Sequence, residues 1–399
     1  MRTKRGAGVE DYRPLTVGGY AAAAARTDRG VEGQSLAFPL LGLVGEVGSL
    51  LSELKKKQRD PASYRSHSDA VTEELGDVLW YLAAVARRGG VALSAVAAHL
   101  YRRDAQWRGV DDPTLTFEAL QPHPIAPGGA PTANFEETLL DLASDVGLLI
   151  GDFQAGRLEL DQGLLPMRLS AILTRLLRAS REAHLTLEVA AIKNTYKIFD
   201  RWPEKREYPE AFDADADPDE QLPRRLEVEV YEKRVGDKDY VFQRCNALFI
   251  GDRLTDNSLE PDDYRFHDVF HYAFVAVLGW SPVTRALMRL KRKSQPQIDD
   301  AEDGARAILI EEGVSTWVFG QAQRLNYFEG VEIGKLPLDL LKQIKQFVAG
   351  YEADRLPLWL WEEAILQGYE VFRYLRQHRR GRVILDFETR SLRVEPLAS

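Results

Sequence analysis

Two segments near the N-terminus carry apolar residues at spacings of three and four. They read "SLAFPLLGLVGEVGSLLSELKKK" (35–57) and "SDAVTEELGDVLWYLAAVARRGG" (68–90). This periodicity predicts two amphipathic helices, and two glycines at 89–90 predict the end of the second. A third helix is expected from near Ala92 to about Trp107. Because each helix has one apolar face, this region must fold by packing its helices against one another.

A weaker copy of this pattern follows along the chain. "EVGSLLSE" (46–53) aligns without gaps on "DVGLLIGD" (145–152), at an offset of 99 positions. "ELGDVLWYL" and "VALSAVAAHLYRR" align on "RLSAILTRL" and "LTLEVAAIKNTYK", both at an offset of 94. We interpret the copy as a duplicated helical unit that packs on its twin as a pseudo-dimer. The alternative is that any two amphipathic helical hairpins align this well.

Two linker-like stretches divide the chain into three parts. The first, "QPHPIAPGGAPTAN" (121–134), is dense in proline and glycine, and the second, "WPEKREYPEAFDADADPDEQLP" (202–223), is acidic. The predicted parts are a helical repeat over 1–120, its degenerate copy over 135–202, and a C-terminal domain over 224–399.

The C-terminal part has a different pattern. "RRLEVEVYEKRVGDKDYVFQRCNALFIGD" alternates around a Gly-Asp turn and predicts a β-hairpin, and "GRVILDFETRSLRVE" predicts a return to the same small sheet. Helices are expected between them, at about 262–278, 284–293, 302–323, 337–349 and 358–378. The predicted fold class is mainly α: a tandem helical bundle followed by a mostly helical α+β domain.

Composition narrows the classes of partner. The net charge of −9 argues against general nucleic-acid binding, although a local basic patch is compatible with this charge. A single cysteine, Cys245, excludes an internal disulfide framework and fits a reducing compartment. No apolar run approaches the roughly 20 residues that span a bilayer, and no apolar signal segment follows the basic N-terminus. We expect a cytoplasmic, soluble protein without a membrane partner.

Acidic residues recur on the apolar helices. Glu46, Ser49 and Glu53 share one helical face, and Glu74 and Asp77 share another. If the two faces meet, their carboxylates repel one another unless a divalent cation lies among them. Oxygen ligands alone favour Mg²⁺ or Mn²⁺ over zinc. The alternative is that these acids are an exposed helix face.

Glycines inside these helices argue against the exposed face. Gly45, Gly48 and Gly76 each cost about 1 kcal/mol relative to alanine in a helix. Their presence indicates close helix approach or room for a ligand.

The motifs "LGLVGEVGSLLSELKK" and "EELGDVLWYLAAVA" resemble those of the MazG-type all-α nucleoside triphosphate pyrophosphohydrolases, which are related to the dimeric dUTPases. The upstream "YAAAAARTDR" is similar to the tyrosine-to-threonine lead-in of that family. The resemblance is clear over about 18–107 and faint over 137–202. It implies that four acids bind Mg²⁺ and that water cleaves a nucleotide between its α- and β-phosphates, giving a monophosphate and pyrophosphate.

Carried over by position, the resemblance makes Glu46, Glu74 and Asp77 catalytic residues and metal ligands. The fourth acid of the family falls on Ser49, which brings no charge. Glu53, one turn further on, is expected to reach back as the missing metal ligand. The departure at Ser49 puts full activity in doubt, because losing one acid weakens metal binding and water activation together.

The resemblance also assigns substrate-binding residues. In the first repeat, Lys56 matches a lysine that faces the phosphates, and Trp80 lies one turn beyond Asp77, where it can stack on a base. The alternatives are that the lysine only complements the helix dipole and that the tryptophan belongs to the core.

On the last helix of the second repeat, Asn194, Lys197 and Arg201 match the family's substrate-facing residues. We therefore expect one composite active site, with acids from one repeat and polar groups from the other. The alternative is that the second repeat is a scaffold and these three residues are solvated.

The C-terminal domain offers candidate residues for a second site. His267 and His271 are four residues apart on one predicted helix, and Glu311 and Glu312 lie on another. Two such histidines and a distant acid can bind a metal or perform acid–base chemistry. Asp268, beside His267, resembles the HD phosphohydrolases only loosely, and the alternative is a buried, hydrogen-bonded histidine pair. The domain is similar to the extra domain attached to some MazG-type proteins, whose activity does not follow from the resemblance.

The leading functional hypothesis is a Mg²⁺-dependent pyrophosphohydrolase acting on a ribo- or deoxynucleoside triphosphate or a modified relative. The alternative is a weakly catalytic module that senses a nucleotide and regulates the C-terminal domain. The duplication reduces the need for a partner subunit, yet bundles of this type often pair again as homodimers. Base, sugar and pathway stay open.

Overall fold

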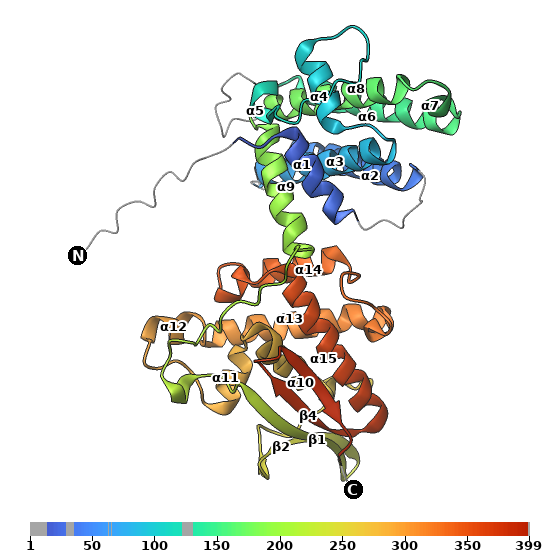
Figure 1. Cartoon of the computed structure of the whole chain (residues 1–399). Helices are drawn as coiled ribbons and strands as arrows, with labels where there is room; N and C mark the ends of the chain where they lie inside the picture. The colour runs from blue at the N-terminus through green and yellow to red at the C-terminus, as the bar shows by residue number, and fades with distance from the viewer. Residues whose placement is uncertain (1–13, 29–35, 63, 65, 122–130, 398–399) are drawn as a thin grey trace, which may run out of the picture. The chain divides into compact units, whose positions relative to one another are not determined.

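A computed structural model of the protein describes residues 14–28, 36–62, 64, 66–121 and 131–397 (Figure 1). Most of the first predicted linker therefore lies outside the described residues. The chain divides into two compact units, Met1–Phe199 and Asp200–Ser399. Both predicted helical repeats fall almost wholly in the first unit, where their apolar residues form one core.

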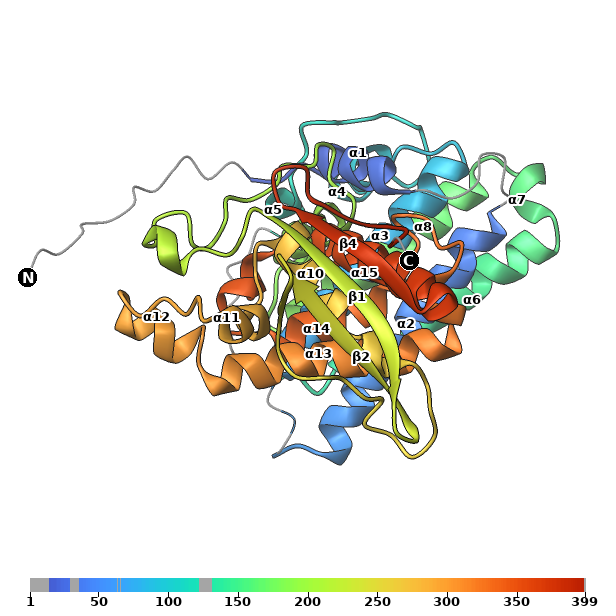
Figure 2. The same cartoon turned by 90° about the horizontal axis from the view of Figure 1, so that it is seen from below.

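The first unit is helical in the residues that the structure describes. Its helices are α1 Val17–Thr27, α2 Ala37–Arg59, α3 His67–Arg88, α4 Leu93–Arg102, α5 Phe117–Leu120, α6 Phe135–Gln154, α7 Arg157–Leu160, α8 Leu164–Glu182 and α9 Leu187–Arg201. Helix α2 packs against α3 and α6 against α8, and the two hairpins meet through α2 with α6 and α3 with α8 (Figures 1 and 2).

Helix α2 shows how the periodic pattern is used. Its residues Leu40, Leu43, Val47 and Leu50 repeat at spacings of three and four and are buried in the first core. By length and composition alone, α2 is also the one helix among the described residues that would be able to cross a membrane. That is weak support for a membrane span, because a core helix passes the same test.

Two threonines 100 positions apart occupy matching places. Thr16 and Thr116 each cap their own helix, accepting hydrogen bonds from the amides three residues on. The segments around the two threonines form an isolated antiparallel bridge, in which Val17 N donates to Leu115 O at 2.9 Å and Phe117 N donates to Leu15 O at 3.1 Å. This pairing is compatible with the predicted duplication, which stays a prediction.

Among its described residues, the second unit contains one antiparallel sheet with the order β3-β2-β1-β4-β5. Figure 2 shows β2, β1 and β4 side by side in it. Its strands are β1 Arg225–Val235, β2 Lys238–Cys245, β3 Leu248–Phe249, β4 Arg380–Asp386 and β5 Ser391–Glu395. The predicted hairpin is confirmed: Val235 pairs with Lys238 across the Gly-Asp turn. The C-terminal segment returns to this sheet as β4, which pairs with β1.

Helices cover this sheet and complete the second core. They are α10 Asp268–Ala273, α11 Pro282–Met288, α12 Pro296–Ala301, α13 Ala305–Arg324, α14 Leu338–Phe347 and α15 Leu358–His378. Helices α10 and α15 contact β4 and β5. The predicted fold class, mainly α with a small sheet, is confirmed.

Two predicted helices of the second unit differ from the observed ones. The single helix expected over 262–278 is a 3₁₀ turn at Tyr264–Phe266, then α10, then a π-helical turn at Phe274–Leu278. The helix expected over 284–293 ends at Met288, because Arg289 is left-handed with φ of 62°.

Candidate functional site

Three carboxylates converge in the first unit. Glu46 of α2 and Glu74 and Asp77 of α3 each offer an oxygen within 4.8 Å of the others. The packing of α2 on α3 produces this group, since their apolar stripes face each other and the acids lie at the edge of those stripes. We call Glu46, Glu74 and Asp77 the acidic group.

Glu74 has the most unusual environment of the three. Its Oε2 is buried and has no hydrogen-bond partner among the described residues. Burial and the charges of Asp77, Glu46 and Glu73 raise the pKa of Glu74 to about 7, although Lys197 opposes the shift. The acidic group therefore carries negative charge that the protein does not fully neutralise, which fits a cation-binding site.

Helix α9 brings polar groups to the same place. Asn194 Nδ2 donates a hydrogen bond to Asp77 Oδ1 at 2.8 Å. Lys197 Nζ contacts both carboxylate oxygens of Asp77 and lies 3.3 Å from Glu73 Oε1. The acids of the first hairpin thus meet the amide and ammonium predicted for the substrate side, as the composite arrangement requires.

Tyr20 and Gly76 hold Asn194 in place. The buried hydroxyl of Tyr20 donates to Asn194 Oδ1 at 2.9 Å and lies 3.3 Å from the carbonyl oxygen of Gly76. A Cβ atom at position 76 would lie 2.8 Å from both the Ala190 carbonyl oxygen and Asn194 Cβ. Glycine is therefore needed there for α3 and α9 to approach. Tyr20 was not among the predicted site residues, although the "YAAAAART" motif contains it.

The other two helical glycines have a different setting. A Cβ added at Gly45 or Gly48 would meet nothing within 4 Å. Both glycines are exposed, so neither is needed for a close helix approach. Room for a ligand at these two glycines stays a prediction.

Glu53 and Lys56 lie outside the acidic group. Glu53 is buried and accepts hydrogen bonds from Lys56 Nζ, at 2.5 Å, and from the hydroxyl of Tyr64. The geometry does not support the expectation that Glu53 supplies the missing fourth carboxylate. Lys56 is held by that same ion pair, so its role toward phosphate stays a prediction.

Arg201 has a structural role instead of the predicted substrate contact. It lies in the second unit, where its guanidinium donates to both oxygens of Glu362 at 2.6 and 2.9 Å and to the Leu336 carbonyl oxygen at 2.8 Å. Both charged side chains are at most 2% exposed. The geometry therefore does not support substrate binding by Arg201, because both of its terminal amino groups donate to partners in the core.

Trp80 is half-buried near the acidic group. Its indole Nε1 donates to Thr27 Oγ1 at 3.1 Å, and its ring meets Tyr81 edge to face. The indole N–H is thus satisfied within the protein, and base stacking by Trp80 stays a prediction.

The second hairpin uses arginines where the first has the acidic group. Asp145, which aligns with Glu46, pairs with Arg175 at 3.1 Å. Arg168 pairs with Asp152 at 2.6 Å and, with a second arginine, lowers the pKa of that carboxyl. Built-in guanidinium groups neutralise these acids, so the described part of the second hairpin does not need a cation.

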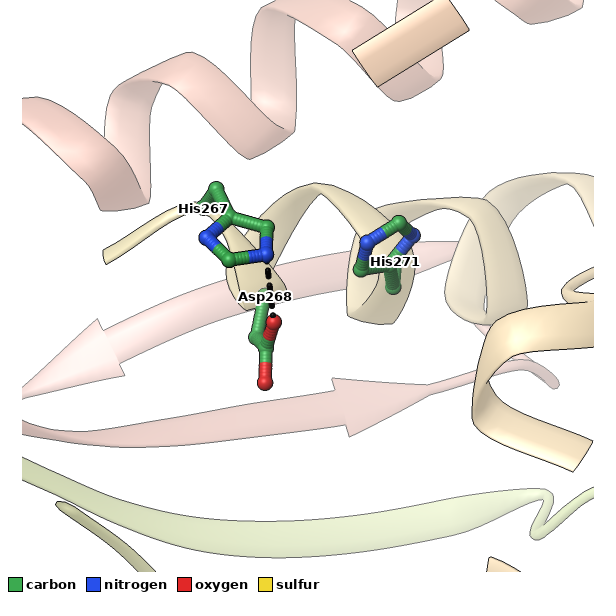
Figure 3. A group of neighbouring side chains, drawn as sticks. All are labelled: His267, Asp268 and His271. Atoms are coloured by element: carbon green, nitrogen blue, oxygen red, sulfur yellow. Dashed lines mark ion pairs between the residues drawn. The ribbon is translucent and has the colours of Figure 1, made fainter. Parts of the chain in front are cut away.

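The second unit holds another group of possible metal ligands. His267, Asp268 and His271 each offer a ligand atom within 4.8 Å of the others (Figure 3). His267 Nε2 lies 3.0 Å from Asp268 Oδ1, and His271 follows on the next turn. We call these three residues the histidine group.

The predicted acids of α13 lie beside the histidine group. Glu311, which is fully buried, is 2.8 Å from His271 Nδ1, and Glu312 Oε1 is 3.6 Å from His271 Nε2. Burial alone would lower the pKa of His271, but the two glutamates raise it well above its ordinary value. The structure therefore brings all four predicted residues of the second site together and adds Asp268.

Comparison with known proteins finds a match to a segment of each unit. Residues 34–103 match the MazG nucleotide pyrophosphohydrolase domain, and residues 207–398 match the MazG C-terminal domain. The gene 37 protein of Mycobacterium phage L5 is 37% identical over 65 residues, which are 16% of this chain and 57% of the phage protein. The chain thus spans just over half the length of that relative. No solved structure matches it.

The acidic group falls inside the first matched segment and the histidine group inside the second. Together the two segments cover about two thirds of the chain. The chain therefore contains a MazG nucleotide pyrophosphohydrolase domain and a MazG C-terminal domain, and the first is the domain of the nucleoside triphosphate pyrophosphohydrolases, hydrolases that act on acid anhydrides.

Proposed function

We propose that this chain hydrolyses a nucleoside triphosphate between its α- and β-phosphates, giving a nucleoside monophosphate and pyrophosphate, with Mg²⁺ or Mn²⁺ as the cofactor. The observation that carries the proposal is the meeting of the acidic group with Asn194 and Lys197 on one side of α3. Carboxylates suit hard divalent cations, and an amide and an ammonium suit the polar parts of a nucleotide.

Glu46, Glu74 and Asp77 would hold the cation. The unpartnered, buried Oε2 of Glu74 and the raised pKa of that carboxyl support this assignment, because a cation would relieve both. When bound, a divalent cation offsets phosphate charge and lowers the pKa of a bound water.

The residues of α9 position the substrate and the acids. Asn194 is locked between Tyr20 and Asp77, so its amide fixes the direction of the Asp77 carboxylate. The Lys197 ammonium has three donors and pairs with Glu73 and Asp77. When a nucleotide binds, the ammonium can turn toward the phosphate oxygens.

The reaction is a displacement at the α-phosphorus. A water oxygen forms a bond to that phosphorus while the bond to the bridging oxygen breaks, and pyrophosphate leaves with the electron pair. The proton of the water passes to a carboxylate of the acidic group.

The test is a panel of ribo- and deoxynucleoside triphosphates incubated with Mg²⁺ and separated by chromatography. The expected products are monophosphate and pyrophosphate in equal amounts, lost in Asp77→Asn. Release of inorganic phosphate and a nucleoside diphosphate instead, or unchanged turnover in Asp77→Asn, would refute the proposal.

The alternative function is a nucleotide sensor that regulates the C-terminal domain. The observation that favours it is the absence of a fourth acid: Ser49 replaces it and Glu53 is engaged elsewhere. Calorimetric titration of the same nucleotides separates the two functions. Tight binding without turnover for the whole panel supports the sensor, and turnover supports the enzyme.

A further inference from the structure

The histidine group of the second unit has a hydrogen-bond pattern that fixes which ring nitrogens are free. His267 Nδ1 lies 2.9 Å from the Tyr264 carbonyl oxygen, and His271 Nδ1 lies 2.8 Å from Glu311 Oε1. Both partners only accept hydrogen bonds, so each Nδ1 carries the proton. In the neutral rings, each Nε2 therefore presents a lone pair.

Those lone pairs face carboxylates. His267 Nε2 is 3.0 Å from Asp268 Oδ1, and His271 Nε2 is 3.6 Å from Glu312 Oε1. His271 is 1% exposed, and its Nε2 has no hydrogen-bond partner among the described residues. A neutral ring's lone pair is repelled by such a carboxylate, so each pair needs a positive charge between its atoms. That charge is either a second ring proton, which the raised pKa of His271 favours, or a metal ion.

The surroundings hold each of these side chains from behind. Glu311 is fixed by the Ser281 hydroxyl and the Val283 amide, both at 2.7 Å. Asp268 Oδ2 accepts a hydrogen bond from Gln243, whose own oxygen accepts one from the Tyr272 hydroxyl at 2.5 Å. Histidines that give one N–H to a carboxylate or carbonyl and leave the other nitrogen free are typical of metal sites.

We propose that the C-terminal domain binds one divalent transition-metal ion, Zn²⁺, Mn²⁺ or Fe²⁺, through Nε2 of His267, a carboxylate oxygen of Asp268 and Nε2 of His271. Two imidazole nitrogens and a carboxylate favour such ions over Mg²⁺. Ligand atoms within 4.8 Å of one another need only a small rotation, since two ligands of one ion are at most about 4.2 Å apart.

Glu312 lies on the open side of this site. Its side chain is 38% exposed, whereas that of His271 is 2% exposed. Three protein ligands leave at least one position for water or a substrate, and Glu312 is placed to serve as a fourth ligand or as a base. The short π-helix that follows α10 at Phe274–Leu278 is a further feature that is frequent at functional sites.

The experiment uses the full chain with Glu46→Gln, Glu74→Gln and Asp77→Asn, so that the acidic group no longer binds a cation. This makes the test independent of the proposed pyrophosphohydrolase. After dialysis against Zn²⁺ or Mn²⁺, metal per chain is measured by mass spectrometry. The expected result is one ion per chain in the parent protein. The affinity for that ion should be at least tenfold lower in His267→Gln and in Asp268→Asn.

His378→Gln is the matched control, because His378 is exposed at the end of α15 and must leave binding unchanged. Circular dichroism establishes that each variant is folded. If the histidine variant is unfolded, the comparison rests on Asp268→Asn. Bound Mn²⁺ should also show ¹⁴N coupling in electron spin echo spectra. Binding that is equal in all variants, an oxygen-only spectrum, or no stoichiometric ion in the parent chain would overturn the proposal.

Discussion

Asn194 Nδ2 donates a hydrogen bond to Asp77 Oδ1 at 2.8 Å, although the two residues are 117 positions apart. The bond joins the last helix of the first unit to the helix that carries two of the three clustered acids. It makes the acidic group dependent on α9, which supplies no acid of its own to the group.

Lys197→Ala should lower kcat/KM for nucleotide hydrolysis by about 10- to 100-fold, because hydrogen bonds to charged groups contribute about 1.5–3 kcal/mol. Lys193→Ala is the matched control. Lys193 lies one turn earlier on α9 and pairs with Asp69 at 3.0 Å, where both side chains are exposed. Steady-state kinetics of the two variants decide the point: equal effects, or none, would show that α9 is only a scaffold.

Gly76→Ala should destabilise the first unit and separate α3 from α9. The added methyl group would lie 2.8 Å from the Ala190 carbonyl oxygen, which is backbone and cannot turn aside. Gly45→Ala meets no atom within 4 Å and should raise stability by about 0.5–1 kcal/mol through helix propensity. Chemical denaturation measures both. A Gly76→Ala protein as stable as wild type would contradict the close approach.

The metal-free protein should lose stability as pH rises from 4.5 to 7. Burial and the neighbouring carboxylates raise the pKa of Glu74 from 4.5 to about 7. The folded state therefore holds this proton more tightly than the unfolded state, so the penalty is absent below pH 4.5 and complete above pH 7. Melting curves in a chelator, compared with Glu74→Gln, isolate this contribution.

Added Mg²⁺ should reverse that loss in the wild type above pH 7 and have little effect on Glu74→Gln. Glu118→Gln, an exposed change on α5, is the control and should keep the wild-type pH profile. The prediction would be contradicted if the melting temperatures of wild type and Glu74→Gln changed equally with pH across this range.

Much of the acidic group could be predicted from spacing. Residues three apart on a helix share a face, so Glu74 and Asp77 had to lie together, and the apolar stripes of α2 and α3 had to bring Glu46 to them. Spacing also placed Glu53 on the face of Glu46. Spacing allowed the ion pair of Glu53 with Lys56, but it could not show that Tyr64 engages Glu53, because that contact depends on how the chain turns after α2.

Arg201 shows a different limit of sequence reasoning. It follows Asn194 and Lys197 at spacings that keep all three on one helical face. The last residues of α9 nevertheless belong to the second unit, so the face that meets the acids in the first unit ends before Arg201. Periodicity describes a helix, and it does not show where the neighbouring domain begins.

Arg201→Ala should therefore destabilise the second unit by about 3–5 kcal/mol, because it leaves Glu362 buried without its partner. Arg201→Met with Glu362→Met should recover most of that loss. Lys205→Ala, which breaks an exposed pair with Glu207, should change stability by less than about 0.5 kcal/mol. Denaturation curves give these values, and a nucleotide KM that rises in the folded double variant would restore a substrate role.

Ser49→Glu should strengthen cation binding and raise turnover at low Mg²⁺. Ser49 is half-buried and lies one turn from Glu46 on the same face of α2, so a glutamate there can add a fourth carboxylate to the acidic group. Each added anionic ligand favours a divalent cation, and we expect about a tenfold lower Mg²⁺ concentration at half-maximal activity.

Val44→Glu is the matched control, since Val44 is exposed and, two residues before Glu46, lies about 200° away from it around α2. Titration of Mg²⁺ against pyrophosphate release compares the two variants. Tighter Mg²⁺ binding in Ser49→Glu with no turnover in either protein would favour the sensor, because the cation would then be present without the reaction. Equal Mg²⁺ dependence in both variants would instead place Ser49 outside the acidic group, and the family's fourth acid would have no counterpart on α2.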